Sequence, residues 1–506
     1  MLEIDNRNEV SIYDVVNVAR NRQEVRLSES AKEAIVKSRG FVEDILRQNK
    51  VVYGISTGFG EFSKITISGE NREKLQRNLI LSHSVGVGEL FGEDVVRGIM
   101  LLRVNSLARG YSGIRLSTVE KLIELLNKNI TPAVPKQGSV GASGDLAPLS
   151  HVAAVLLGEG FVMKNGIAVP ALPVLKEAGF RPIELAAKEG LALINGTQAM
   201  TSVAALVCYD AEKLIKIADI AAAMSLEALG GTLKAFDERI AKIRPHPGQL
   251  QSARNINTLT SESKILQGNK NEKVQDAYSL RCISQVHGAS RDAWRRALET
   301  VDIEMNAVTD NPIVMADTGE IISGGNFHGQ PVALVMDYLK TALAEIGNIS
   351  ERRINRLVDP HLSGLPAFLT KEGGVNSGLM IAQYTAASLV SENKVLVHPA
   401  SADSIPTSAN QEDHVSMGTI AARQAAEILE NVRYVLAIEM IAAAQGIDFL
   451  GEKPGRGTHP AYEQIRKLVP FIENDRILNT DFEKVFKAIV SESIIAVVEG
   501  AVGELN

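Results

Sequence analysis

Long stretches without proline constrain the fold of this chain more than any other feature of its sequence. Residues 183–244, 248–311 and 407–453 contain no proline and are rich in Ala, Leu, Glu, Lys and Arg. In the window AARQAAEILENVRYVLAIEMIAAAQ (421–445), apolar residues recur every three or four positions, which is typical of an amphipathic helix. The sequence therefore predicts a mainly α protein built around a bundle of long helices.

The length of the chain predicts more than one domain. A single hydrophobic core rarely extends over 506 residues, and the composition changes near residues 180–200, where the long helical windows begin. We therefore predict an N-terminal domain at residues 1–195 and a long-helix domain at residues 196–506. Within the first, Ser28 precedes an amphipathic stretch and is expected to cap a helix.

Charge and cysteine content exclude several classes of protein. The net charge is −7, so non-specific binding to nucleic acid or to an anionic membrane is not expected. Two cysteines are too few for a disulfide framework, and the polar N-terminus MLEIDNRNEV does not resemble a secretory signal. No apolar run approaches the roughly 20 residues that span a bilayer. We expect a cytoplasmic protein, and the histidines form no spacing that predicts a metal site.

The string GSVGASGDLAPLSH (138–151) interrupts the helical pattern. A bare G-x-x-G pattern is usually a plain turn before a helix, and Asp145 is then expected to cap the helix that follows, with Pro148 in its first turn. The full fourteen-residue string is much more specific than such a turn. Its glycines allow a tight backbone, and its loop is predicted to end at the positive end of a helix.

The string resembles the active-site segment of the aromatic amino acid ammonia-lyase and aminomutase family. Further matches follow in family order along most of the chain: YGISTGFG (53–60), SH (82–83), INGTQ (194–198), QDAYSLRC (275–282), NAVTDNP (306–312), SGGNFHGQP (323–331) and SANQEDHVSMG (408–418). The resemblance implies a fold of the fumarase/aspartase-like superfamily. It also implies a homotetramer whose active sites are shared between chains.

The resemblance further implies that the chain builds its own electrophile, with no external cofactor. In the family, an Ala-Ser-Gly tripeptide cyclises into a 4-methylidene-imidazol-5-one ring (MIO), which here would form from Ala142, Ser143 and Gly144. The amide nitrogen of Gly144 attacks the carbonyl of Ala142, whose oxygen leaves as the first of two waters, and glycine bends that far with little steric penalty. Ser143 then loses its hydroxyl as water and leaves an electrophilic methylene.

Two residues are expected to bind the substrate's polar groups and to remove its proton. Tyr53 matches the family's tyrosine and is the candidate base for the β-proton, which requires a pKa below its ordinary value of about 10. Arg281 is the expected anchor of the substrate carboxylate, which a guanidinium binds through two parallel hydrogen bonds. Without the family match, a packed tyrosine and a surface arginine would be the better interpretations.

Four further residues match positions that line the family's site. Asn195, Gln275 and Tyr278 are expected to hydrogen-bond the ring and the substrate as negative charge develops, and Phe327 is expected to form an apolar wall. Outside this context, helix caps, satisfied buried amides and an ordinary core residue explain them equally well.

His83 and Glu412 bear on the choice of substrate. Relatives that act on phenylalanine carry an apolar residue and an uncharged amide at these places, whereas a histidine and a carboxylate suit an imidazole. Together they favour L-histidine, whose deamination to trans-urocanate and ammonia is the first step of histidine degradation. A tyrosine or phenylalanine ammonia-lyase, an aminomutase of the same family and a non-catalytic helical relative remain the alternatives.

Overall fold

The structure is a computed structural model that describes residues 1–48, 52, 57, 71–268 and 274–506. Tyr53 and most of the glycine-rich loop at 53–60 lie outside these described residues. The predictions made for them therefore remain predictions.

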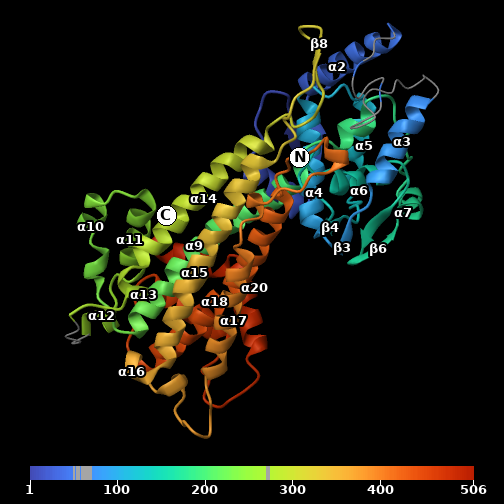
Figure 1. Ribbon diagram of the computed structural model, residues 1–506. Helices are drawn as coiled ribbons and strands as arrows, with labels where there is room; N and C mark the ends of the chain where they lie inside the picture. The colour runs from blue at the N-terminus through green and yellow to red at the C-terminus, as the bar shows by residue number, and fades with distance from the viewer. Residues whose placement is uncertain (49–51, 53–56, 58–70, 269–273) are drawn as a thin grey trace. The chain divides into compact units, whose positions relative to one another are not determined.

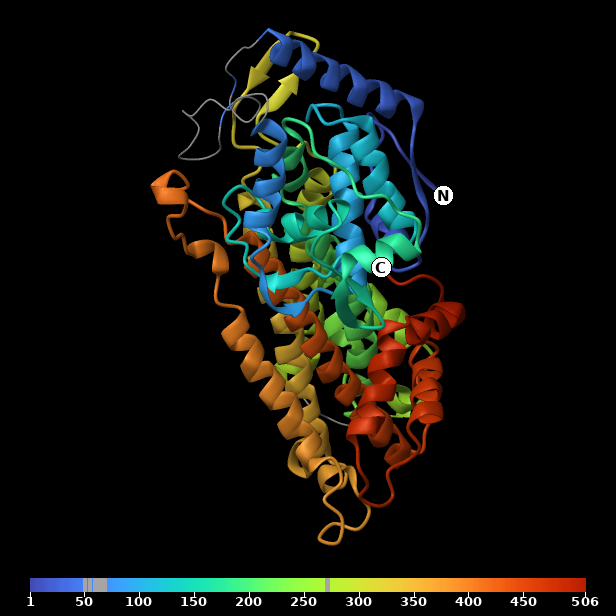
Figure 2. The same ribbon diagram turned by 90° about the vertical axis from the view of Figure 1, so that its right-hand side faces the viewer.

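The prediction of a mainly α protein with long helices is confirmed. Among the described residues, four helices exceed twenty residues and run side by side in the bundle drawn in Figure 1 and Figure 2: α9 (Gln198–Ala228), α14 (Ile283–Met305), α15 (Gln330–Val358) and α18 (Gly418–Leu450). The amphipathic window at 421–445 lies inside α18. Helices of this length form here because alanine and leucine are good helix formers and no interior proline interrupts the backbone hydrogen bonds.

The described chain forms two compact units, each assembled from three stretches of sequence. Unit 1 comprises residues 1–209, 298–337 and 399–423, and unit 2 comprises residues 210–297, 338–398 and 424–506. Each of the four long helices contributes residues to both units. The division predicted between residues 195 and 196 stays a prediction, because the units are defined by contacts rather than by sequence position.

Unit 1 contains shorter helices and four two-stranded sheets. The β1–β2 pair is parallel, and β3–β4, β5–β6 and β7–β8 are antiparallel. Its elements besides the long helices are β1 (Leu2–Ile4), α1 (Ile12–Ala19), β2 (Val25–Leu27), α2 (Glu29–Arg47), α3 (Arg72–His83), β3 (Val87–Leu90), α4 (Glu93–Ala108), α5 (Leu116–Asn127), β4 (Pro135–Gln137), α6 (Leu146–Leu156), β5 (Phe161–Lys164), β6 (Ile167–Pro170), α7 (Ala171–Glu177), α8 (Glu189–Ile194), β7 (Ile313–Met315) and β8 (Glu320–Ile322).

The helix predicted to follow Ser28 is α2. The Ser28 side chain accepts a hydrogen bond from the backbone nitrogen of Ala31 at 3.1 Å, so one free N–H group of the first turn is satisfied. The capping prediction for Ser28 is confirmed.

Unit 2 surrounds its parts of the long helices with shorter ones. These are α10 (Glu238–Ile243), α11 (Pro247–Leu259), α12 (Lys264–Gly268), α13 (Tyr278–Arg281), α16 (Pro360–Ser363), α17 (Met380–Leu396), α19 (Thr458–Leu468), α20 (Asn479–Val490) and α21 (Ser493–Val502). Glu439 of α18 ties three long helices together, since its buried carboxylate accepts from Ser225 of α9 and from Ser350 and Arg353 of α15. A buried carboxylate is stable only with such partners.

None of the helices in the described part of the chain combines the length and the apolar character that crossing a bilayer requires.

Candidate active site

The segment that precedes α6 has a backbone that only glycine suits at two positions. Gly141 and Gly144 have φ angles of +68° and +71°. A Cβ atom on Gly144 would lie 2.1 Å from the carbonyl oxygen of Gly196, and one on Gly141 would lie 2.2 Å from the Ser416 hydroxyl. Both the angle and the space therefore require glycine here, which brings the Ala142–Gly144 backbone into close contact with two other segments.

The same segment lies against the beginnings of three helices. It leads directly into α6. Gly144 forms a bridge with Gly196, and the Asp145 nitrogen donates to the Gly196 oxygen at 2.7 Å, two residues before α9. The Met417 nitrogen, adjacent to α18, donates to the Val140 oxygen at 2.9 Å. Because the N-terminus of a helix carries a partial positive charge, three such ends favour electron density at residues 142–144.

Asp145 corrects one expectation from the sequence. Its side chain makes no capping hydrogen bond to α6. Its fully buried carboxylate instead accepts from the Met200 nitrogen of α9 at 2.8 Å, from the Ser139 hydroxyl at 2.9 Å and from the Thr419 hydroxyl. Burial raises the pKa of Asp145, against the lowering effect of these hydrogen bonds. The carboxylate therefore caps α9 and connects it to α18, because tertiary donors are better placed than those of its own helix.

Ser143 contacts one of the residues expected to choose the substrate. Its hydroxyl donates to Glu412 Oε1 at 3.0 Å, and the Thr407 hydroxyl donates to Glu412 Oε2 at 3.0 Å. The backbones of Thr407 and Glu412 also pair with each other. Both oxygens of this half-buried carboxylate are thus held in place beside the tripeptide.

His83, the last residue of α3, lies within electrostatic reach of the same carboxylate. Burial lowers the pKa of His83, and the charge of Glu412 acts in the opposite direction. The His83 Nδ1 atom lies 3.1 Å from the Ser82 hydroxyl. The structure therefore brings together the two residues that the sequence analysis linked to an imidazole.

Apolar side chains enclose the tripeptide on another side. Ala142 is 8% exposed and packs in a cluster with Val415 and Met417. Phe327 lies half-buried in the 323–331 segment, and its neighbour His328 stacks on His414 with ring centroids 5.7 Å apart. This stack connects the segments that carry Phe327 and Glu412.

Asn195 is almost fully buried and is held at both its backbone and its side chain. Its Nδ2 atom donates to the Asn311 oxygen at 2.9 Å, and its own carbonyl accepts from Arg103 Nη1 at 2.9 Å. Its Oδ1 atom has no hydrogen-bond partner among the described residues. A buried acceptor without a partner is costly, so this atom suits a donor from a bound molecule.

Unit 2 holds the remaining predicted residues as a separate group. Tyr278 and Arg281 lie on α13, and Gln275 lies just before it. Tyr278 is 71% exposed, and the Arg281 guanidinium carbon lies 4.4 Å from the centre of its ring. Arg281 Nε has no hydrogen-bond partner in the described part of the chain. Tyr278 and Gln275 are thus exposed, whereas Arg281 is half-buried against the Tyr278 ring.

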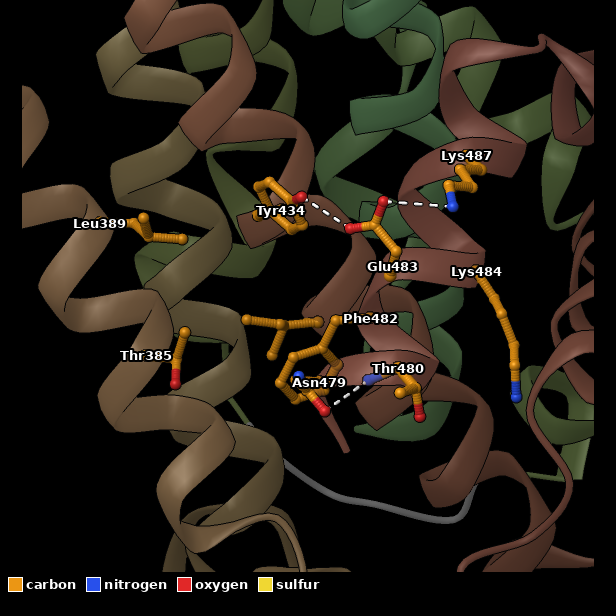
Figure 3. Close-up of a pocket in the computed structure, with 10 residues that line it drawn as sticks. Thr385, Leu389, Tyr434, Asn479, Thr480, Phe482, Glu483, Lys484 and Lys487 are labelled. Atoms are coloured by element: carbon orange, nitrogen blue, oxygen red, sulfur yellow. Dashed lines mark hydrogen bonds and ion pairs between the residues drawn. The ribbon is translucent and has the colours of Figure 1, made fainter. Parts of the chain in front are cut away.

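Unit 2 also contains a pocket of about 670 Å³ between α17, α18 and α20 (Figure 3). Its charged and phenolic groups have partners, since Tyr434 donates to Glu483 at 2.8 Å and Lys484 pairs with Asp481, outside the pocket lining, at 2.9 Å. Burial, with Glu483, raises the pKa of Tyr434 to about 12, which makes this phenol a poor base at neutral pH. The pocket contains none of the residues that the sequence analysis linked to the chemistry, so we do not assign the reaction to it.

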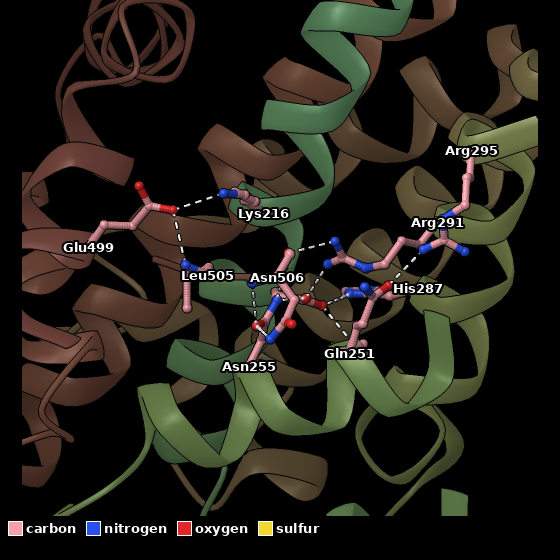
Figure 4. Close-up of polar contacts among 11 residues, drawn as sticks. Lys216, Gln251, Asn255, His287, Arg291, Arg295, Glu499, Leu505 and Asn506 are labelled. Carbon is pink, nitrogen blue, oxygen red and sulfur yellow. Dashed lines mark hydrogen bonds and ion pairs between the residues drawn. The ribbon is translucent and has the colours of Figure 1, made fainter. Parts of the chain in front are cut away.

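A buried His–Asp pair in unit 2 is structural. His287 Nδ1 lies 2.8 Å from Asp219, whose carboxylate also accepts from Arg291, Asn255 and Ser252. Figure 4 shows His287, Arg291 and Asn255 gathered around Asn506. Both members of the pair are fully buried, so a substrate cannot reach them.

Sequence reasoning missed several residues that organise the site. They donate hydrogen bonds to Asn195 or to Gly141 and Asp145, which flank the tripeptide: Ser139, Thr419, Ser416 and Arg103. Arg103 is fully buried, and this burial lowers its pKa to about 10. An arginine inside the apolar pattern of α4 was the one available signal, because a buried guanidinium needs specific acceptors.

Comparison with known proteins shows what this chain is similar to. The sequence model of the family described as aromatic amino acid lyase matches residues 10–467. A histidine ammonia-lyase of Alkaliphilus oremlandii is 55% identical over 495 residues, which are 98% of this chain and 98% of that protein. A second, from Caldanaerobacter subterraneus, is 55% identical and covers 96% of each chain.

Solved structures give the same result for the fold. The crystal structure of histidine ammonia-lyase from Trypanosoma cruzi has a TM-score of 0.93 at 43% identity and covers 100% of this chain and 96% of that one. The structure of tyrosine aminomutase from Streptomyces globisporus has a TM-score of 0.95 at 40% identity and covers 100% of both chains.

Proposed function

Because the chain belongs to the aromatic amino acid lyase family, we propose that it is a histidine ammonia-lyase, a carbon–nitrogen lyase that converts L-histidine to trans-urocanate and ammonia. This reaction is the first step of histidine degradation. The observation that carries the substrate assignment is the contact of Glu412 with Ser143, in electrostatic reach of His83.

The residues at 142–144 fit the MIO group of this family. Gly144 has the positive φ and the lack of space that exclude a side chain, Ala142 is small and enclosed, and Ser143 carries the hydroxyl that ring formation removes. MIO supplies an electrophilic methylene that takes up electrons from the substrate and makes its amine a better leaving group. We propose that this chain forms it from Ala142, Ser143 and Gly144 without an external cofactor.

Glu412 and His83 recognise the imidazole of the substrate in this proposal. Loss of the Ser143 hydroxyl removes the donor that Glu412 Oε1 accepts from, and this oxygen is then free for an imidazole N–H. The Thr407 hydroxyl continues to hold Oε2 and so fixes the direction of the carboxylate. A phenyl ring offers no such donor and would leave both polar residues unsatisfied.

The other residues bind the amino acid portion and move the proton. Arg281 binds the substrate carboxylate, and Tyr278 and Gln275 from the same stretch provide further hydrogen bonds. Asn195 offers a buried oxygen to a donor of the substrate, and Phe327 forms an apolar wall. From the family match alone, Tyr53 is proposed to remove the β-proton, which requires a pKa below the ordinary value of a tyrosine.

We further propose a homotetramer in the cytoplasm, with active sites shared between chains. The exposure of Tyr278 and Gln275 supports this assembly, because they are available to the ring-bearing segment of another copy. Light scattering of the purified protein tests the assembly: the proposal expects four chains, and a monomer with full activity rejects the shared site.

A substrate panel tests the function. Purified protein is mixed with L-histidine, L-tyrosine or L-phenylalanine, the ultraviolet absorbance of the conjugated product is followed, and each mixture is analysed for β-amino acids. The proposal expects urocanate from L-histidine and little product from the other two. Turnover of tyrosine or phenylalanine alone rejects the role of His83 and Glu412, and a β-amino acid product identifies an aminomutase.

A further inference from the structure

His151 ends the fourteen-residue string that contains the tripeptide, yet the proposed chemistry gives it no task. It lies half-buried on α6, and its Nε2 atom accepts a hydrogen bond from the backbone nitrogen of Gly86 at 3.0 Å. A ring nitrogen accepts a hydrogen bond only when it carries no proton. Burial lowers the pKa of His151, which favours this neutral form.

Gly86 lies in the short segment between His83 and β3. The Val85 nitrogen donates to the His83 oxygen at 2.9 Å, so a single tight turn separates His83 from Gly86. β3 then pairs with β4, with Val87 opposite Gln137, the residue directly before the string at 138–151. His83 is therefore connected to the segment of Ser143 in two ways: through the Gly86–His151 hydrogen bond and through the pairing of β3 with β4.

The contact between Gly86 and His151 leaves little spare room. A Cβ atom on Gly86 would lie 3.1 Å from His151 Nε2, 3.1 Å from Pro135 Cβ and 3.3 Å from the Gln137 oxygen. These distances are tighter than most real Cβ contacts. The turn after His83 is thus seated directly on α6 and β4, the two elements that flank the tripeptide.

We propose that His151 is a positioning residue that fixes His83 relative to the tripeptide and thereby sets the affinity for the substrate's side chain. It acts through Gly86 and the turn that ends α3, and it does not touch the substrate. This inference rests on the proposed function, because His83 faces an imidazole only if L-histidine is bound. A binding residue is precise only when its supporting contacts hold it.

Paired substitutions of His151 test the hydrogen bond. His151→Met removes the acceptor at similar volume, whereas His151→Gln keeps an acceptor at a similar reach. With L-histidine, we expect His151→Met to raise KM about fivefold, the effect of about one hydrogen bond, with kcat within about twofold and complete loss of two waters from the tripeptide. His151→Gln is expected to have a KM within about twofold of that of the enzyme without substitutions. Gly86→Ala crowds the same contact from the other side and should raise KM in the same way.

A double-mutant cycle separates this role from a general one. In a His83→Ala background, His151→Met should raise KM no further, since the effect passes through His83. His361→Met, an exposed histidine of unit 2, is the matched control and should leave KM unchanged.

The inference is overturned if His151→Met leaves KM unchanged, if His151→Gln is as impaired as His151→Met, if the two effects add in the cycle, or if the variants lose the ring. Failure of the proposed function gives a different result, because the protein without substitutions would then show no turnover of L-histidine.

Discussion

The surroundings of Ser143 and those of Arg281 differ in how much of the chain holds them. Around Ser143, α9 and α18 donate buried hydrogen bonds to Asp145, and Glu412 accepts hydrogen bonds from Ser143 and Thr407. Arg281 lies on a helix of four residues, beside a tyrosine that is 71% exposed, and its Nε atom has no partner among the described residues.

This difference separates two tasks within one reaction. Ring formation strains the backbone and requires an environment that is complete before the substrate arrives. Binding of the substrate carboxylate requires free donors, which a fully satisfied region does not have. Loss of the buried hydrogen bonds in the first region, which centre on Asp145, should therefore affect both ring formation and stability, whereas substitutions in the second region should affect catalysis alone.

The largest expected effect comes from Ser143→Ala. Without a hydroxyl to leave, the ring does not form, and we expect the rate of L-histidine deamination to fall at least about 10³-fold while the melting temperature changes little. The urocanate assay and thermal unfolding measure the two quantities. Substantial residual turnover would show that the reaction does not depend on this tripeptide.

Arg281→Ala should weaken catalysis about 100-fold in kcat/KM, because two charge-assisted hydrogen bonds to the substrate carboxylate are lost. Loss of two waters from the tripeptide and the melting temperature should not change. Arg281→Lys keeps the charge but not the paired geometry, so its kcat/KM should lie between that of Arg281→Ala and that of the protein without substitutions. A large drop in melting temperature would mean that Arg281 supports the fold, which contradicts the contrast drawn above.

Asp145→Asn should destabilise the protein by about 2 kcal/mol, because its amide nitrogen replaces one accepting oxygen and then faces either the Met200 N–H or the hydroxyls of Ser139 and Thr419. Urea unfolding measures this change, and mass spectrometry should show incomplete ring formation. Asp317→Asn is the matched control, since Asp317 is exposed and its pairing with Lys37 contributes little. Equal stability of the two variants would reject the account of Asp145.

Glu412→Gln should lower kcat/KM for L-histidine about tenfold and leave the fold intact. The neutral amide keeps a hydrogen bond with Thr407 but loses the charge that assists binding of the imidazole. Measurement of kcat/KM for the variant and for the enzyme without substitutions tests this prediction. An unchanged value would show that Glu412 is not part of the site.

Sequence patterns predicted the long helices and the Ser28 cap because these depend on local physics. Absence of proline and the spacing of apolar residues suffice for a helix such as α18, and a serine before a helix caps its first turn. Asp145 behaved differently, because its carboxylate accepts from Met200, 55 residues further along the chain. Sequence spacing contains no information about such a tertiary contact.

For the same reason, the sequence predicted the residues within the family motifs but not those that support them through tertiary contacts. The family motifs indicated Ser143, His83 and Glu412, and the structure brings these together within unit 1. The motifs did not indicate Arg103 or Thr419, which donate hydrogen bonds to the Asn195 oxygen and to the Asp145 carboxylate. Their roles depend on which helices meet, and this became visible only in the folded chain.

The central claim is that Ala142, Ser143 and Gly144 become the electrophile, and the mass of one peptide tests it directly. Cleavage after Lys136 and Lys164 releases residues 137–164 as a single tryptic peptide that contains the tripeptide. The account predicts that this peptide is lighter than its sequence by two water molecules, and that the same peptide from Ser143→Ala carries no complete ring. A peptide of unmodified mass from a protein that deaminates L-histidine would contradict the account.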